Sequence, residues 1–559
     1  ELEGKVVGGD VVFEFEPAYS FGFFFDFGKE ITLNAIQAYG DTEYKGASVN
    51  VSNAQDYTLF ANGLTENDSR VIANDGNYIL TSETGTDREW YFDLDAESYG
   101  YDYPSFYAPN TPLAEAAYNL TMKEVYNSIR DTEDGDVFYT GTGWAKVWTR
   151  DTAMSMQYIL SWLFPEISTN CAYAKVVGKD GNLTFEEDTG TGGSYPVSTD
   201  RIIMMLAVWE NYLANGNKED LEYFYNVASN TIMQDYEVVY DKEAGLFRGE
   251  TCGLDHRDKT YADWTGENDE NGIVTIAEGK AANTNILFCQ AMKILSESAL
   301  ILGKGEEESK AWADLAADLE KAIADRLWLE DLGTYTSWEY PDWMGSPLAY
   351  KQDVLANGYA VWYNIGGQEK ADSIMENHTL VPFGANTVYP NKSAERWADY
   401  KYHDSGIWPG WEAILMIGAV NNENENNLLA EEIWNSCIRG AVSCLTNYEV
   451  IDYETGRGLH STNQLWSVAA TMAGYYRVLY GMEYTTDGIT FDPYVPSWME
   501  GPFYVENYKY RDATLSLTLN GKGDTVDSIY VNGEKVEDTV AGVGEGTDKL
   551  YAALKLFDY

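Results

Sequence analysis

The sequence is poor in basic side chains. Its 559 residues include 37 Lys and Arg against 90 Asp and Glu, which gives a formal net charge of −53. Such a charge repels phosphate backbones and anionic lipid headgroups, so we expect no nucleic-acid partner. The acidity concerns solubility and is compatible with a salty habitat or with secretion, and the sequence does not decide between these.

Cysteine and long apolar runs are also scarce. Five cysteines are scattered along the chain without a CxxC pair or nearby histidine pairs, which indicates neither a disulfide framework nor a zinc site. No apolar run approaches the roughly 18 residues that a membrane-spanning helix needs, so we expect no membrane insertion. GxSxG, HExxH, P-loop and dinucleotide motifs are missing in the right context, which removes support for hydride and phosphoryl chemistry.

Aromatic residues, in contrast, are abundant. The chain holds 43 Tyr, 20 Phe and 17 Trp, or 14% of its residues. Their flat apolar faces and polar tips suit stacking against sugar rings. Helical cores and β-sandwiches also use aromatics, so composition alone leaves carbohydrate binding and ordinary core packing as equal interpretations.

Hydrophobic periodicity divides the chain into regions. Residues 1–98 alternate in short runs punctuated by Gly and Asn, which predicts a β-sandwich-like domain, and the turn-rich residues 99–112 predict a linker. Residues 113–490 change to a period of 3.6 and predict a helical domain, while residues 491–559 predict a small β domain. In this β domain Asn532-Gly533 is expected to be a hairpin turn, and the residues from Gly542 onward are assigned to no element. About eleven helices are expected, at residues 113–130, 151–163, 199–215, 219–240, 281–302, 306–327, 351–363, 368–376, 409–420, 427–445 and 464–480.

Short turns alternate with long aromatic loops between these helices. A closed ring of helical hairpins has this pattern, because its long loops gather at one mouth. An α-solenoid should instead show a motif at a fixed period, and none is found. We therefore predict a mainly α protein, an (α/α)6 toroid with an N-terminal β domain and a small C-terminal β domain.

Two early loops of the helical region combine polar and aromatic residues. In residues 143–151 (GWAKVWTRD), Arg150 and Asp151 either cap a helix or bind sugar hydroxyls beside Trp148. Residues 246–264 begin LFRGETCGLDHR and place Glu250 and Asp255 five residues apart, near aromatic rings that could desolvate one carboxyl and raise its pKa. A solvated loop of an acidic protein would look similar.

Two late loops have the same character. Residues 400–411 (YKYHDSGIWPGW) begin a helix with proline and hold His403, for which hydroxyl binding and a structural role are both open. Residues 447–460 (NYEVIDYETGRGLH) bring three carboxylates, at Glu449, Asp452 and Glu454. A ring would place an acid from an early loop opposite a base from a late one, the pairing that glycosidic cleavage needs.

Acidic turns at residues 131–136 and 267–272 resemble calcium loops only in their alternating oxygens, and neither completes the EF-hand spacing. We therefore predict no metal and no cofactor, with a structural calcium left as an alternative.

The four loops resemble motifs of the six-hairpin (α/α)6 glycosidases, most of all the clan of trehalases and the family 63 processing α-glucosidases, over about residues 113–482. Residues 250–255 (ETCGLD) resemble the E-S-G-x-D loop of that clan with one inserted residue, which implies that Asp255 is the general acid. Residues 148–151 resemble the W-x-R-D segment that lines the sugar subsite, and residues 406–409 resemble the G-x-W-P helix start.

The resemblance also implies a general base. Glu449 precedes residues 453–456 (YETG) and the pair Trp466-Ser467, and so resembles the clan's Glu ahead of Tyr-Asn-Pro-x-Thr-Gly. The Asn-Pro is absent here, which leaves Asp452 and Glu454 as alternative bases.

The resemblance implies an inverting exo-glycosidase acting on a terminal bond, with an α-glucoside as the first substrate to test. Alternatives on the same fold are an α-rhamnosidase- or α-mannosidase-like hydrolase or a glycoside phosphorylase, and a non-catalytic glycan-binding surface protein is a further one. Oligomeric state is left open. The expected substrate-binding residues are Trp148, Arg150, Asp151, Glu250, Arg257, Trp264, His403, Trp408, Gln464 and Trp466.

Overall fold

The structure is a computed structural model. It describes residues 103–531 apart from residues 179–180, 189–194, 254–269, 391–401, 404–405 and 454–455, together with several strands nearer the two ends. The chain divides into two compact units, Glu1–Val49 and Asn50–Tyr559. In the first unit, β1 (Lys5–Val7) and β2 (Asp10–Val12) pair in antiparallel fashion.

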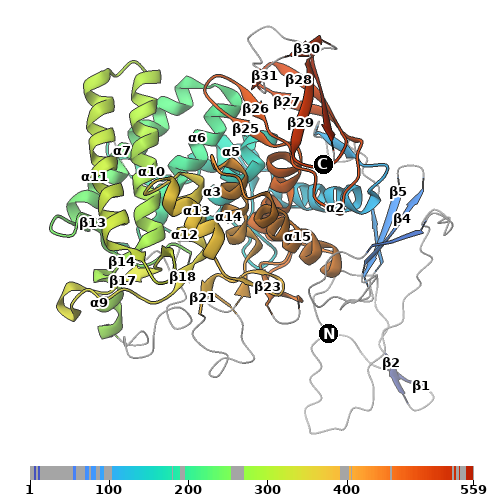
Figure 1. The fold of residues 1–559 in the computed structure, drawn as a ribbon. Coiled ribbons are helices and arrows are strands. Elements are labelled where there is room, and N and C mark those ends of the chain that lie inside the picture. Colours follow the sequence, from blue (N-terminus) through green and yellow to red (C-terminus); the bar gives the residue numbers. More distant parts are fainter. Residues whose placement is uncertain are drawn as a thin grey trace. The chain divides into compact units, whose positions relative to one another are not determined.

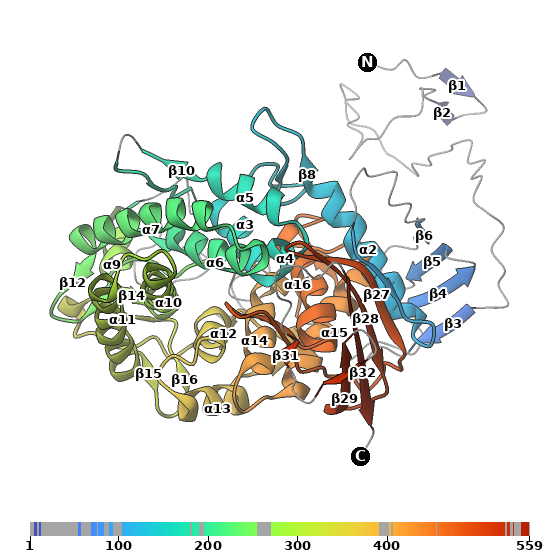
Figure 2. The same cartoon turned by 90° about the horizontal axis from the view of Figure 1, so that it is seen from above.

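Six inner helices form a closed ring in the second unit. Each contacts the next one in chain order, and the last contacts the first, which closes the ring (Figure 2). The inner helices are α3 (Thr149–Ser155), α6 (Ile203–Asn215), α10 (Ala282–Ile301), α12 (Val354–Trp362), α14 (Pro409–Asn421) and α16 (Leu465–Ala473).

Six outer helices pack against the ring, one beside each inner helix (Figure 1). They are α2 (Pro112–Ser128), α5 (Pro165–Tyr173), α7 (Lys218–Val238), α11 (Glu306–Arg326), α13 (Gln368–Asn377) and α15 (Asn427–Cys444). The expected (α/α)6 toroid is therefore confirmed, and all eleven expected helices are present. The twelfth barrel helix, α5, and the short α9 (Glu270–Glu278) were not expected from the sequence.

Burial distinguishes the two layers. In α14, every residue from Pro409 to Ala419 is buried, whereas α11 buries one stripe with a spacing of three or four residues, typical of a helix that faces solvent on its other side. Glycine lets two inner helices approach closely. A Cβ on Gly358 of α12 would lie 2.7 Å from the backbone nitrogen of Leu415, and one on Gly418 of α14 would lie 2.9 Å from that of Trp362.

The two inner helices that close the ring each contain a π-helical segment. These are η2 (Met156–Leu160), which continues α3 into α4 (Ser161–Leu163), and η6 (Gly474–Leu479), which continues α16. Arg477 of η6 donates to the carbonyl oxygens of Tyr158 and Gln157 at 2.6 and 2.8 Å. Its guanidinium also pairs with Glu210 at 3.0 Å, so one buried cation ties the two π segments together.

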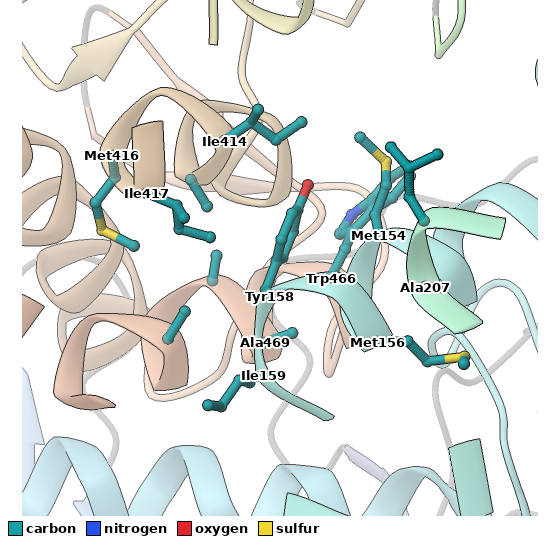
Figure 3. Close-up of a cluster of buried hydrophobic side chains, with 14 of the residues drawn as sticks. Met154, Met156, Tyr158, Ile159, Ala207, Ile414, Met416, Ile417, Trp466 and Ala469 are labelled. Carbon is teal, nitrogen blue, oxygen red and sulfur yellow. The ribbon is translucent and has the colours of Figure 1, made fainter. Parts of the chain in front are cut away.

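Buried apolar side chains of the inner helices pack together in one cluster (Figure 3). Tyr158 points between α14 and α16 and its hydroxyl donates to the carbonyl oxygen of Gly410, while Trp466, Met154 and Ile414 pack around it.

The C-terminal residues form a six-stranded sheet in the order β30-β29-β32-β28-β27-β7. Its strands are β7 (Ser105–Tyr107), β27 (Phe503–Tyr510), β28 (Ala513–Asn520), β29 (Thr525–Val531), β30 (Glu534–Val536) and β32 (Lys549–Phe557). Val531 pairs with Glu534, as the expected two-residue hairpin requires. The segment expected to be a linker thus supplies an edge strand, and β32 lies in a stretch that the sequence left unassigned.

Residues ahead of the ring are β-structured where they are described. A four-stranded antiparallel sheet contains β3 (Ala54–Tyr57), β4 (Ser69–Asn74), β5 (Asn77–Ser82) and β6 (Glu89–Phe92). No helix of the described residues combines the length and the apolar character needed to cross a membrane.

Candidate active site

A small sheet brings two of the polar-aromatic loops together. Its strands are β22 (Gly406–Ile407), β23 (Val450–Asp452) and β24 (Gly458–Leu459), and Ile407 is paired with Ile451. β22 leads directly into α14, while β23 follows α15. This pairing places Glu449, immediately before β23, in the neighbourhood of Trp408, immediately after β22.

Glu449 is a buried, hydrogen-bonded carboxylate with 2% of its surface exposed. Its Oε1 accepts from the indole nitrogen of Trp144 at 3.0 Å and from the hydroxyl of Tyr402 at 3.2 Å, and its Oε2 accepts from the backbone N–H of Ser461 at 3.2 Å. Burial raises the pKa of Glu449 above its ordinary value, and these donors, with the charge of nearby His460, lower it again in part. A carboxylate with a raised pKa binds a proton more tightly than an exposed one, as a general base requires.

The loop that carries Trp144 is fastened to the loop that follows Glu449. The backbone N–H of Thr142 donates to the carbonyl oxygen of Thr462 at 3.1 Å, and the two threonine hydroxyls are 2.9 Å apart. The N–H of Gly143 donates to Ser461 Oγ at 3.0 Å. Trp144 itself keeps 37% of its surface exposed, so it joins the buried carboxylate to the solvent side of the site.

An aromatic cluster lies on the other side of Glu449. Trp408 and Trp411 stack with ring centres 4.0 Å apart and planes 6° apart, and Trp466 meets both of them edge-on at 5.4 and 5.5 Å. Tyr402 joins this cluster to Glu449, because its ring lies 4.9 Å from that of Trp408. The ring of His403 stacks on that of Tyr402, with ring centres 4.5 Å apart, and His403 is 2% exposed, so it is part of the aromatic cluster.

Arg150 and Asp151 stand in the first turn of α3, beside the same cluster. The residue at the N-cap position is Trp148, and no side chain caps this helix, so the alternative in which Asp151 is an N-cap is wrong. Asp151 Oδ1 accepts from the amide of Gln464 at 3.5 Å. The Arg150 guanidinium lies 6.0 Å from the Trp466 ring centre and pairs with Asp200 at 3.4 Å.

Trp148 is half-buried and lies close to the exposed rim of the site. Its ring centre is 6.2 Å from that of Trp144, with the two planes nearly perpendicular. The ammonium of Lys146 lies 3.5 Å from the Trp148 ring centre and 3.6 Å from Asp188 Oδ2. One face of Trp148 is therefore covered by a cation that is itself tethered to a carboxylate.

The loop with the expected acid is described up to Gly253. Glu250 is buried and accepts from the hydroxyl of Ser198, and the N–H of Cys252 donates to Asn283 Oδ1 at 2.9 Å. Gly253 has a φ of +81°, and a Cβ there would lie 3.2 Å from Cζ2 of Trp411, so the chain touches the aromatic cluster at this point. The following expected site residues lie outside the described residues: Asp255, Arg257 and Trp264.

Among the residues that the structure describes, several buried polar atoms in and beside the cluster have no hydrogen-bond partner. They are the indole nitrogens of Trp148, Trp411 and Trp466 and the side-chain oxygen of Gln464. Buried polar atoms are satisfied in the great majority of cases, so a group of unsatisfied ones marks a place where a ligand with hydroxyl groups can bind. Among the residues that the structure describes, no group of three or more His, Cys, Asp or Glu side chains is arranged to hold a metal ion.

The structure brings together most of the expected site residues that it describes. Trp148, Arg150, Asp151, His403, Trp408, Glu449, Gln464 and Trp466 are linked by the contacts given above, and Glu250 lies three residues before the contact of Gly253 with Trp411. Sequence reasoning missed Trp144, Tyr402 and Trp411 as site residues. All three stand in the segments that were singled out for aromatic content, but nothing in a linear pattern shows which rings reach the carboxylate.

The sequence matches no protein-family model and no curated protein. The fold is similar to that of a sialidase, with a TM-score of 0.60 and 13% identity over 84% of this chain and 52% of that one, so the chain spans about half the length of this neighbour. It is also similar to the family 78 rhamnosidase of Bacillus sp. GL1, with a TM-score of 0.50 and 15% identity over 82% of this chain and 44% of that one.

A third similar structure is the family 63 mannosylglycerate hydrolase from Thermus thermophilus in complex with glucose. The TM-score is 0.50 and the identity 12%, over 64% of this chain and 98% of that one. At these identities the similarity shows the fold alone. The expected resemblance to six-hairpin glycosidases is therefore confirmed at the level of the fold.

Proposed function

We propose that the protein is an inverting exo-glycosidase, with Glu449 as general base and Asp255 as general acid. The observation that carries the proposal is the surroundings of Glu449. This carboxylate is buried, accepts hydrogen bonds on both oxygens, and adjoins an aromatic cluster that contains unsatisfied polar atoms. A sugar offers apolar ring faces to the aromatics and hydroxyls to the polar atoms.

Chain connectivity supports the role of Asp255. Gly253 touches Trp411, and Asp255 follows two residues later in the sequence. Trp411 stacks on Trp408, which contacts Tyr402, a direct hydrogen-bond donor to Glu449. The position of Asp255 in the sequence, two residues after this contact, supports its assignment as the acid.

The reaction needs one proton donor and one proton acceptor. Asp255 gives its proton to the glycosidic oxygen as the bond from the anomeric carbon to that oxygen breaks. Glu449 takes a proton from a water whose oxygen attacks the anomeric carbon from the opposite face. The products are an alcohol and a free sugar of inverted configuration, and the mechanism requires carboxyl groups about 6.5–9.5 Å apart, with room for the water.

Substrate contacts divide between the rim and the wall of the site. Trp144 presents exposed ring surface and Trp148 is half-buried, whereas Trp408, Trp411 and Trp466 are buried. The indole nitrogens of Trp148, Trp411 and Trp466 are proposed to donate to sugar hydroxyls. Arg150, Asp151 and Gln464 supply the charged and amide groups that hydroxyls bind. Glu250, His403, Arg257 and Trp264 are proposed to complete the pocket, and a terminal α-glucoside is the first substrate to test.

The test is a panel of aryl glycosides and oligosaccharides with wild-type protein and Asp255→Asn. Release of a terminal sugar by the wild type and its loss in Asp255→Asn is the expected result. Proton NMR of the first-formed anomer then reports the stereochemistry, and retention of configuration would contradict the water-activation step. Turnover that depends on phosphate would identify a phosphorylase, and binding of glycans without any turnover would identify a non-catalytic lectin-like protein.

A further inference from the structure

Glu124, a carboxylate on outer helix α2, lies far in sequence from Glu449 but contacts the turn that leads to it. The Glu124 carboxyl group accepts from the hydroxyl of Thr446, and its Oε2 accepts from the backbone N–H and the side-chain amide of Asn447 at 2.9 and 2.7 Å. Glu124 is 5% exposed, and the donors to its carboxyl group are these neutral groups of Thr446 and Asn447. Three neutral donors from one turn therefore account for its position.

The turn held by Glu124 joins α15 to β23 and ends at Glu449. It begins at Leu445, whose φ of +57° lies in the left-handed region that residues with a Cβ seldom adopt. Such a conformation persists only when surrounding contacts enforce it. Leu445 is the C-cap of α15, and the N–H groups of Leu445 and Thr446 hold it by donating to the carbonyl oxygen of Ala441. Glu124 then fixes the two residues that directly follow Leu445.

The same network reaches the second loop around Glu449. The backbone N–H of Asn463 donates to the Thr446 hydroxyl at 3.1 Å, and its side-chain amide donates to the carbonyl oxygen of Glu124 at 3.0 Å. The carbonyl oxygen of Asn447 accepts from the N–H of Gln464 at 2.9 Å, and Glu449 N–H donates to Ser461 at 2.8 Å. Both loops that border the Glu449 carboxylate are thus fastened to one point on α2.

We infer that Glu124 is a positioning residue, which sets the orientation of the Glu449 carboxylate through the turn at Thr446 and Asn447. The inference rests on the proposed function, in which Glu449 is the base. A carboxylate suits this task because it accepts on both oxygens, whereas a glutamine would turn an N–H₂ group toward one of the donors. Displacing a catalytic group by about 1 Å can cost on the order of 100-fold in rate.

The experiment compares Glu124→Gln with Glu115→Gln, a matched control on the same helix. Glu115 is also buried, and it accepts from the backbone N–H of Ala108 at 3.0 Å, away from the Glu449 loops. With an aryl glycoside that the wild type hydrolyses, kcat of Glu124→Gln should fall by about 10- to 100-fold with KM changed less than about threefold. Glu115→Gln should keep wild-type kcat, and a wild-type kcat in Glu124→Gln would overturn the inference.

A double-mutant cycle separates positioning from general damage to the fold. If Glu124 acts through Glu449, adding Glu124→Gln to Glu449→Gln should slow the residual reaction by less than about twofold. The same fold-loss in both backgrounds would overturn the inference. If Glu124→Gln does not fold, Thr446→Val decides: kcat should fall about three- to tenfold, and an unchanged kcat would overturn the inference.

The same experiments distinguish this inference from the proposed function. Wild-type hydrolysis by Glu449→Gln would remove Glu449 as the base and this inference with it. Lost activity in Glu449→Gln together with wild-type activity in Glu124→Gln and Thr446→Val would overturn only the role of Glu124.

Discussion

The indole nitrogen of Trp144 lies 3.0 Å from Oε1 of Glu449, although 305 residues separate the two along the chain. The hydrogen bonds between Thr142 and Thr462 hold the Trp144 loop against the loop that follows Glu449. A hydrogen bond to an ionised carboxylate stabilises its charged form. A half-exposed ring therefore helps to keep a buried base ionised, against the effect of burial.

Trp144→Phe should shift the pH dependence of hydrolysis. The change removes the N–H donor but keeps an aromatic ring, so the pKa of Glu449, already raised by burial, should rise further. Because the base must be ionised, the acidic limb of the kcat/KM profile should move to higher pH, by about half to one pH unit. Trp343→Phe is the control, since Trp343 is 64% exposed and donates to Glu278. A limb that stays in place, or moves to lower pH, would contradict the role given to the indole.

Substitution of each carboxylate in the late loop should identify the base. Glu449→Gln should lower kcat by about 10²- to 10⁴-fold, the range typical of a lost general base. Asp452 is half-buried, and its backbone N–H pairs with the carbonyl oxygen of Arg457, so Asp452→Asn should cost no more than a few-fold. Glu454 lies outside the described residues, and Glu454→Gln completes the series. The largest loss at Asp452 or Glu454 would transfer the role of base to that residue.

The ring could be predicted because its helices carry long periodic patterns. The inner helices are buried nearly all round and the outer ones on a single stripe, so both kinds stand out in the sequence. Helix α5 was not predicted because it is short, with nine residues, and begins at Pro165. It buries only Ile167, Ser168, Cys171 and Ala172. Strand β32 was not predicted because it forms by pairing in parallel with β28 and in antiparallel fashion with β29, and the local sequence pattern does not indicate these partners.

The site could be predicted only in part, for a similar reason. Segments rich in polar and aromatic residues were expected to form the site, and the structure brings the segments of Arg150, Trp408 and Glu449 together. The partners of Glu449 could not be found, because Trp144, Tyr402 and Ser461 meet it through ring closure and loop docking rather than through spacing along the chain. The sequence also gave no sign that Trp408 and Trp466 would be almost fully buried.

Gly410→Ala should displace side chains of the aromatic cluster and lower the stability of the protein. A Cβ at Gly410 would lie 2.6 Å from Cγ of Trp466, a contact that real Cβ atoms do not make, so the indole or α14 must move. Overpacking of this kind typically costs about 1–3 kcal/mol, and the thermal midpoint should fall. Hydrolysis should weaken as well, because Trp466 lies beside Arg150.

Gly440→Ala on α15 is the matched control for that change. The nearest atom to its new Cβ is Cδ1 of Ile451 at 3.1 Å, the flexible end of a side chain, and alanine favours a helix over glycine by about 1 kcal/mol. Its stability should therefore be unchanged or improved. A wild-type thermal midpoint and wild-type activity in Gly410→Ala would contradict this prediction, because they would show that the aromatic cluster accommodates the added Cβ without loss of stability.

A buried carboxyl group on α14 should make the stability of the protein depend on pH. Burial raises the pKa of Glu412 to about 8. The folded protein therefore holds a proton on this group over a range in which the unfolded chain, with a glutamate pKa of about 4.3, has lost it. The stability due to this group is fully present below the unfolded pKa and is lost as pH rises through the folded one, at up to about 1.4 kcal/mol per pH unit.

Burial has the largest effect on the pKa of Glu412, although hydrogen bonds from Ala385, Ser436 and Cys437 lower it in part, and the protonated carboxyl group also finds hydrogen-bond partners. The hydroxyl of Ser436 lies 2.6 Å from the carbonyl oxygen of Phe383 and 2.7 Å from Glu412 Oε1, yet it has a single proton for these two acceptors. A protonated Glu412 can donate to Ser436, which then donates to Phe383, while Oε2 still accepts from the N–H of Ala385 at 2.8 Å. A glutamine can make the same three contacts without carrying a charge.

Glu412→Gln should therefore flatten the decline in unfolding free energy between pH 5 and pH 8.5, measured by denaturant titration at each pH. The flattening should be partial, because burial also raises the pKa values of Glu124 and Asp353 to about 7 and these groups keep their own contributions of the same sign. Glu330→Gln removes the same charge from an exposed position of the helical domain and should leave the slope as in the wild type. Equal slopes for Glu412→Gln and the wild type would mean that Glu412 is already ionised at pH 5 in the folded protein, so that burial does not control its proton.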